Sequence, residues 1–120
     1  MNHLKRILLV EDDTDQLACL STLLELNGYE VTAVPSGAEG LEALKSTPVD
    51  IVISDVAMPE MNGPSFVHHL RQLEGYSNVP VILLSSGTEA IDFSKVAFRA
   101  DSFMLKKELP AKLLNNLAAL

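Results

Sequence analysis

Residues 51–63 read IVISDVAMPEMNG and hold the pattern that indicates the fold. The run Ile51–Ile53 is short, continuous and apolar, which is typical of a strand buried on both faces of a parallel sheet. The run leads to Asp55, and a loop containing Pro59 and Gly63 follows. Three further apolar runs share this form. They are Ile7–Val10, Val81–Leu84 and Phe103–Leu105, and Glu30–Val34 is a weaker strand candidate.

Segments with the spacing of amphipathic helices alternate with these runs. In the first segment, Leu17, Leu20 and Leu24 share one face, and Gly28 ends the predicted helix. Five strands that alternate with five helices predict an α/β fold, a single doubly wound domain around a five-stranded parallel sheet. The other helices are predicted from Ser36 and Glu39, from Pro64, over Glu89–Phe98 and after Pro110.

Composition bounds the function of the chain. A length of 120 residues fits one domain, and 48% hydrophobic residues exclude a disordered chain. The net charge of −7 argues against nucleic-acid binding and against anionic membrane surfaces. The single cysteine, Cys19, excludes an internal disulfide, and we expect it to pack in or near the core. The apolar run after Lys5 and Arg6 is too short for a signal peptide, so we expect a cytoplasmic protein.

Polar residues gather where the predicted strands end. Two or three carboxylates within about 5 Å repel by roughly 3 kcal/mol per pair at an effective dielectric near 20. Such a cluster needs a cation, and hard oxygen ligands suit Mg²⁺. Any one of these residues alone could be a helix cap, a turn residue or a solvated strand end. Together they predict a site that could receive a phosphoryl group. The residues are Glu11, Asp12 and Asp13, then Asp55, then Ser85, then Lys106.

Flavin or nucleotide binding is the main competitor for this kind of sheet edge. A flavin phosphate is cradled by a loop rich in hydroxyl groups and glycine after the first strand. Here that loop begins with three acids, which would repel a resident phosphate. The dinucleotide fingerprint and the Walker A loop are absent from the sequence as well.

Along nearly its whole length the sequence resembles the receiver domains of two-component response regulators. The resemblance implies a flavodoxin-like fold with strand order 2-1-3-4-5 and a single receiver domain over residues 1–120. The apolar C-terminal end suits either a natural end or a receiver cut from a longer protein, and we favour the second. The matching pieces are ILLVEDD at 7–13, ISDVAMPEMNG at 53–63, PVILLSS at 80–86 and DSFMLKK at 101–107.

The resemblance also implies a role for each matching residue. Asp55 corresponds to the aspartate that accepts a phosphoryl group from a histidine kinase or a histidine phosphotransfer protein. Asp12 corresponds to a direct Mg²⁺ ligand, and Glu11 to an acid that reaches the metal through water. The remaining correspondences are Ala57, whose backbone carbonyl would bind the metal, Ser85 and Lys106, which would contact the phosphoryl group, and Phe103, the switch aromatic.

The implied function is a Mg²⁺-dependent switch that catalyses its own phosphorylation and dephosphorylation and turns over no outside substrate. Phosphorylation would change the face built from the fourth helix, the fifth strand and the fifth helix. That face would then bind an output domain or a second copy of the chain. The sequence departs from the commonest pattern at Ser86 (usually Ala), Arg99 (usually Gly) and Lys107 (usually Pro), with small residues at Ala57 and Gly87.

Two alternatives belong to other classes of protein. A pseudo-receiver would bind partners without phosphorylation, and Ser86 and Lys107 keep that hypothesis open. A Mg²⁺-dependent phosphatase would use Asp55 as nucleophile and would want a second acid two residues later as general acid. Ala57 stands at that position, which argues against the phosphatase.

Overall fold

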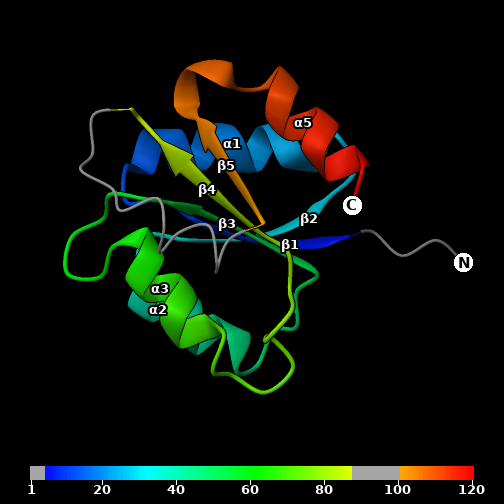
Figure 1. Ribbon diagram of the computed structural model, residues 1–120. Coiled ribbons are helices and arrows are strands. Elements are labelled where there is room, and N and C mark those ends of the chain that lie inside the picture. Colours follow the sequence, from blue (N-terminus) through cyan, green and yellow to red (C-terminus); the bar gives the residue numbers. More distant parts are fainter. Residues whose placement is uncertain (1–4, 88–100) are drawn as a thin grey trace, which may run out of the picture.

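The computed structural model describes residues 5–87 and 101–120, and its centre is a parallel five-stranded sheet (Figure 1). The strand order is β2-β1-β3-β4-β5, which confirms the predicted order. Each strand runs one residue beyond its apolar run, except β3, which runs two residues beyond, and β2, whose bounds match the prediction. The strands are β1 (Arg6–Val10), β2 (Glu30–Val34), β3 (Ile51–Asp55), β4 (Val81–Ser85) and β5 (Ser102–Leu105).

Helices cover both faces of this sheet, as a doubly wound fold requires. Figure 1 shows α1 (Thr14–Leu26) and α5 (Ala111–Ala118) on one side of the sheet. The opposite side is covered by α2 (Gly37–Leu44) and α3 (Gly63–Leu70). A short 3₁₀ helix, η1 (Lys106–Glu108), leads from β5 towards α5. The helix predicted over residues 89–98 lies outside the described residues.

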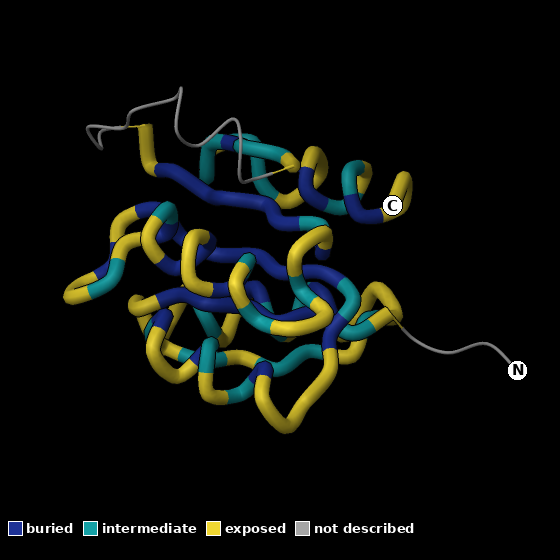
Figure 2. The backbone as a smooth tube through the Cα atoms, turned by 60° about the horizontal axis from the view of Figure 1, so that its bottom comes forward, coloured by how far each residue is buried: buried dark blue, intermediate teal, exposed yellow. Residues whose placement is uncertain are grey.

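The core lies in two layers, one on each face of the sheet. Side chains alternate between the two faces along a strand, so Ile7 and Leu9 join the α1 and α5 layer, whereas Leu8 and Val10 join the other. Strands β3 and β4 are buried along their whole length, and they form the dark centre of Figure 2. This double burial explains why the strands read as continuous apolar runs.

Capping residues set where the helices begin, next to the sheet edge. The carboxylate of Asp13 accepts hydrogen bonds from the backbone N–H groups of Asp15 and Gln16 and so caps α1. Ser36 caps α2, and Asn62 caps α3 ahead of Pro64. Asp13 is therefore used as a helix cap, which leaves Glu11 and Asp12 to face the edge of the sheet.

The structure corrects the expectation for Cys19, which is exposed on α1. The buried face of α1 carries Leu20 and Leu24, one turn apart. Cys19 is next to Leu20 in sequence and is rotated by about 100° around the helix, so it points away from the sheet. Among the described residues, none of the helices is both long and apolar enough to cross a membrane.

Candidate functional site

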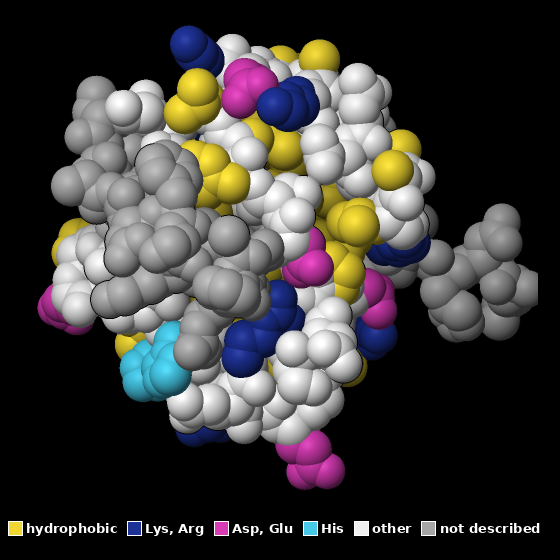
Figure 3. Space-filling view, in the orientation of Figure 1, with side chains coloured by type: hydrophobic (Ala, Val, Ile, Leu, Met, Phe, Trp, Pro, Cys, Tyr) yellow, Lys and Arg dark blue, Asp and Glu magenta, His cyan; other side chains and the backbone are white. Residues whose placement is uncertain are grey.

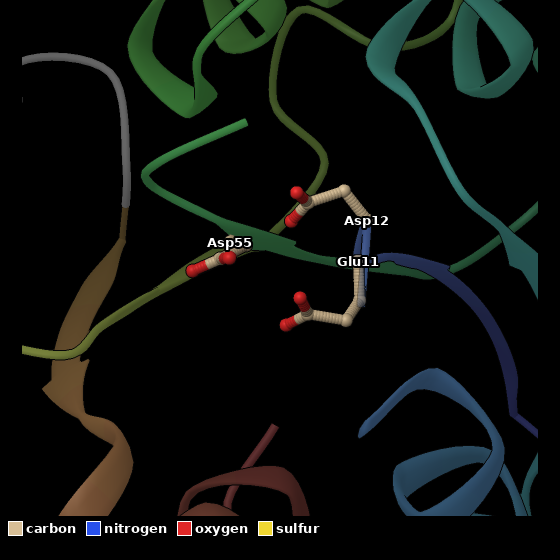
Figure 4. Close-up of side chains that lie close together, drawn as sticks. All are labelled: Glu11, Asp12 and Asp55. Atoms are coloured by element: carbon tan, nitrogen blue, oxygen red, sulfur yellow. The ribbon is translucent and has the colours of Figure 1, made fainter. Parts of the chain in front are cut away.

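Three carboxylates converge at the carboxyl edge of the sheet (Figure 4). Strands β1 and β3 are parallel neighbours in which Val10 pairs with Ser54. The residues that follow these two positions therefore meet. Glu11 and Asp12 come from the end of β1, and both turn their carboxylates towards Asp55 at the end of β3. One oxygen from each of the three residues lies within 4.8 Å of the others.

Burial makes this cluster electrostatically costly. Asp55 is 5% exposed and Glu11 is 1% exposed, whereas Asp12 is exposed. Burial raises the pKa of Asp55 above its usual range, and the charge of Lys106 only partly opposes this shift. Burial likewise raises the pKa of Glu11, although the Asp13 backbone N–H donates a hydrogen bond to it. Burial therefore makes the charged forms of these two acids costly at this edge.

Lys106 is the cation that the structure brings to these acids. Its Nζ lies 3.1 Å from Glu11 Oε2 and 3.2 Å from Asp55 Oδ2. Burial alone would lower the pKa of Lys106, but the hydrogen bond to Glu11 and the charge of Asp55 raise it overall. Lys106 thus stays charged at neutral pH and offsets part of the negative charge.

A third contact of Lys106 was not predicted from the sequence. Lys106 Nζ also donates to Gln16 Oε1 at 2.9 Å, from the first turn of α1. The position of Gln16, just after the acidic run, offered a weak signal that it could reach the same edge. Glutamine is common on exposed helix positions, so the residue type carried no signal of its own.

Ser85 and the loop after β3 complete the edge. Ser85 ends β4, is buried, and accepts a hydrogen bond from the backbone N–H of Gly87 at 2.9 Å. The loop folds back through a 2.7 Å bond from Gly63 N–H to the carbonyl of Val56. A Cβ on Gly63 would lie 2.6 Å from the Asp55 carbonyl oxygen, so only glycine fits this close approach.

Two further predicted site residues, Ala57 and Phe103, lie on the loop after β3 and on β5. Ala57 is exposed on the loop after β3. Phe103 is partly buried on β5 and packs against the core layer beneath α2 and α3. The Lys106–Lys107 peptide is trans, because the one cis bond within residues 5–87 and 101–120 is Leu109–Pro110.

The residues at this edge fit a divalent cation. Asp55 Oδ1 is buried and has no hydrogen-bond partner within the described part of the chain. An unpaired charged oxygen in the protein interior costs free energy that a bound cation would recover. Carboxylate oxygens from three residues match the hard ligands that Mg²⁺ prefers.

The sequence of residues 7–118 matches the protein-family model of the response regulator receiver domain. The chain belongs to this family. Receiver domains are signalling domains of two-component systems, and they are not enzymes that turn over an outside substrate. The family match agrees with the strand order and with the acidic cluster at the carboxyl edge.

Two solved structures of receivers resemble this one closely. Chemotaxis protein CheY4 of Vibrio cholerae superposes with a TM-score of 0.90 at 30% identity and covers 98% of each chain. Response regulator TrrA of Thermotoga maritima, solved in complex with Mg²⁺ and BeF, gives 0.86 at 26% identity over 97% of this chain and 98% of that one. The likeness thus covers the whole receiver fold.

A curated relative is longer than this receiver. The transcriptional regulatory protein PrrA of Mycobacterium leprae is 35% identical over 116 residues, which are 96% of this chain and 49% of PrrA. The chain spans about half or less of the length of the curated relatives that it matches first.

The face of the receiver in Figure 3 carries acidic and basic side chains with hydrophobic ones between them.

Proposed function

We propose that this receiver is a phosphoacceptor switch and that Asp55 accepts the phosphoryl group. The observation that carries the proposal is the buried Asp55 carboxylate, which has one oxygen without a hydrogen-bond partner among the described residues and the other 3.2 Å from Lys106. A carboxylate that only stabilised the fold would have both oxygens paired. One oxygen left unpaired suits a group that binds something else.

The donor in this proposal is a phosphohistidine of a histidine kinase or of a histidine phosphotransfer protein. An oxygen of Asp55 forms a bond to phosphorus while the phosphorus–nitrogen bond to the histidine breaks. The imidazole leaves with that electron pair, and the product is an acyl phosphate on Asp55. Positioning and charge neutralisation are the protein's main tasks in such a transfer.

Each neighbour of Asp55 has a defined task in this transfer. Lys106 places a positive charge beside the incoming phosphoryl oxygens, and Ser85 supplies a hydroxyl donor at the end of β4. Glu11, Asp12, Asp55 and the Ala57 carbonyl would hold Mg²⁺, with Glu11 acting through a water. Bound there, Mg²⁺ would neutralise negative charge that develops on the phosphoryl oxygens.

The switch follows from the charge that phosphorylation adds to the edge. Ser85 turns towards the new acceptor oxygens, and Phe103 moves into the space that opens beside it. Both residues lie on neighbouring strands, since Ser85 pairs with Leu105 in the β4–β5 register. The face around β5 and α5 therefore changes its population of conformers, and an output domain or a second receiver binds it.

The phosphohistidine partner is proposed to approach along α1. An apolar groove with a volume of about 420 Å³ follows the exposed side of this helix, where Leu26 is 81% exposed. A second hollow of about 230 Å³ shares Cys19 with the groove and is lined by Lys106. A helix of the partner lying in this groove would bring its histidine to the Lys106 end. The groove is lined by Ala18, Cys19, Thr22, Leu23 and Leu26.

Intact mass measurement after incubation with acetyl phosphate and Mg²⁺ tests the phosphoacceptor role. We expect one added phosphoryl group on the wild-type chain and none with EDTA. Asp55→Asn should prevent the addition. Asp50→Asn is the matched control, because Asp50 lies just before the same strand and pairs with Arg6 far from the edge. That variant should be phosphorylated like the wild type.

Other outcomes separate this function from the pseudo-receiver. Addition to the Asp55→Asn variant at the wild-type rate would contradict the role of Asp55. No addition to the wild type, together with no response to Mg²⁺ and beryllofluoride, would support an interaction module that works without phosphorylation. Ser86→Ala and Lys107→Pro, which introduce the residues usual in the family, would then be the first variants to test for regained phosphorylation.

A further inference from the structure

The ammonium of Lys106 is held by three acceptors from three different elements. They are Glu11 Oε2 at 3.1 Å, Asp55 Oδ2 at 3.2 Å and Gln16 Oε1 at 2.9 Å. Glu11 and Gln16 accept hydrogen bonds from this ammonium, and Asp55 forms an ion pair with it. The Lys106 side chain is 22% exposed, with the two buried carboxylates on one side and the exposed Gln16 on the other.

The three acceptors of Lys106 differ in how strongly a bound cation would attract their oxygens. Glu11 and Asp55 belong to the carboxylate cluster, so a cation bound there would compete with Lys106 for their oxygens. Gln16 offers a neutral amide oxygen, which is a poorer ligand for Mg²⁺ than a carboxylate. Gln16 can therefore keep its hydrogen bond to Lys106 when the carboxylates turn to a cation.

The backbone at both ends of the Gln16–Lys106 contact is held by other hydrogen bonds. The Gln16 backbone N–H donates to the Asp13 cap at 3.0 Å. The turn that carries Lys106 is closed by Leu105 N–H, which donates to Glu108 Oε1 at 2.9 Å. The side chains of Gln16 and Lys106 also line the same hollow of about 230 Å³ beside α1. The contact thus joins α1 to η1 at the mouth of the site.

We propose that Gln16 is a positioning residue that holds the Lys106 ammonium at the carboxyl edge while a cation engages Glu11 and Asp55. The inference rests on the proposed function, in which Lys106 faces the incoming phosphoryl group. Without Gln16, the lysine side chain would lose its remaining fixed acceptor at the step where its placement matters. Gln16 itself touches neither the cation nor the phosphoryl group.

The variant Gln16→Met tests this role, because methionine keeps the length and helix propensity of glutamine but lacks its amide oxygen. We expect phosphorylation by acetyl phosphate to slow about three- to tenfold, as for the loss of one hydrogen bond to a charged group. The dissociation constant for Mg²⁺ should stay within about twofold, since a ligand change is not involved.

Two controls separate positioning from a structural role. Gln72→Met changes an exposed glutamine away from the edge and should leave the rate unchanged. In a Lys106→Ala background, Gln16→Met should have no further effect, because the two residues would act as one unit. An equal slowing by Gln16→Met in both backgrounds would overturn the proposal.

A direct measurement on Lys106 keeps the inference independent of phosphorylation. We expect the NMR order parameter of the Lys106 ¹⁵Nζ group to stay high in the wild type when Mg²⁺ alone is added. In Gln16→Met it should fall on the same addition. Equal order parameters in the two proteins would overturn the role of Gln16. If the wild type takes up no phosphoryl group from acetyl phosphate, this measurement still decides whether Gln16 holds Lys106.

Discussion

The two ends of strand β3 treat their aspartates in opposite ways. Asp50, just before the strand, accepts hydrogen bonds from the backbone N–H of Arg6 at 2.8 Å and from its Nε at 3.3 Å. These bonds hold the pKa of Asp50 below its usual range. Asp55, at the other end, has its pKa raised by burial, and one of its oxygens has no hydrogen-bond partner within residues 5–87 and 101–120.

The difference lies in how charges are matched at each end. One acid meets one base at the amino end, where the pair stabilises the fold. At the carboxyl end, Glu11 and Asp55 share the single ammonium of Lys106, and Asp12 adds a further acid. Among the described residues, this end thus has more acids than bases, which is unfavourable for folding and suits a bound cation. The comparison separates the part of the sheet edge that serves stability from the part that serves function.

The largest change in stability is expected from Gly63→Ala at the carboxyl end. The new Cβ would press on the Asp55 carbonyl oxygen and on the Val56 Cα, both of them backbone atoms. We expect a loss of about 3 kcal/mol in the free energy of unfolding, measured by urea denaturation. Gly28→Ala is the control, since it has a φ of +91° and open space around it. It should cost about 1 kcal/mol, and an equal cost at both sites would contradict the close approach.

The next effect is stabilisation by Mg²⁺. At a concentration tenfold above its dissociation constant, Mg²⁺ should add about 1.4 kcal/mol to the free energy of unfolding. Asp50→Asn should keep this gain, whereas Asp55→Asn should lose most of it. Thermal unfolding with and without Mg²⁺ measures both. A gain that survives Asp55→Asn would place the cation elsewhere.

Neutralising the two aspartates should change stability in opposite directions. Asp50 has a lowered pKa, so its contribution is present at neutral pH and disappears as the pH falls through that pKa. Asp50→Asn should therefore cost up to about 1 kcal/mol at neutral pH, as for a half-exposed pair.

Asp55 has a raised pKa, so the folded state binds its proton more tightly than the unfolded state does. Stability then falls as the pH rises from about 4 through the raised pKa. Asp55→Asn should remove that fall and make the metal-free protein more stable at neutral pH. Urea denaturation at a series of pH values without Mg²⁺ measures both variants. A stability loss for Asp55→Asn would contradict the account of the carboxyl end.

The smallest effect on the chain itself is expected from Leu26→Ser in the α1 groove. Leu26 is 81% exposed, so the free energy of unfolding should change by less than about 0.5 kcal/mol. Phosphorylation by acetyl phosphate should stay unchanged, whereas transfer from a phosphorylated histidine phosphotransfer domain should slow severalfold. Parallel assays with the two donors measure the difference. Equal rates with the protein donor would rule out the groove as the partner's surface.

Much of this fold could be predicted from the sequence, because burial on both faces leaves a plain apolar signal in each strand. The capping role of Asp13 and the end of α1 near Gly28 were also predictable from local chemistry. The strand order could not be predicted from local chemistry, since it depends on the side of the sheet to which each helical crossover carries the next strand. It came only with the resemblance to the receiver family.

The residues of the site that lie at strand ends could be predicted from the sequence. The contacts made by long side chains could not. Glu11, Asp12 and Asp55 meet because their strands are neighbours. Gln16 meets Lys106 across a separation of 90 residues, through two flexible side chains that no local pattern encodes. Cys19 was wrongly expected near the core because the buried stripe of α1 is narrow, with Leu20 and Leu24 its only buried residues.

The most direct test of the contrast between the two ends is a titration of the metal-free protein with Mg²⁺ and beryllofluoride, followed in ¹H–¹⁵N NMR spectra. The account predicts large, saturable shifts at Glu11, Asp55, Ser85 and Lys106, with the amides of Arg6 and Asp50 unmoved. Asp55→Asn should abolish those shifts. Shifts of equal size at both ends of β3, or none at the carboxyl end, would contradict it.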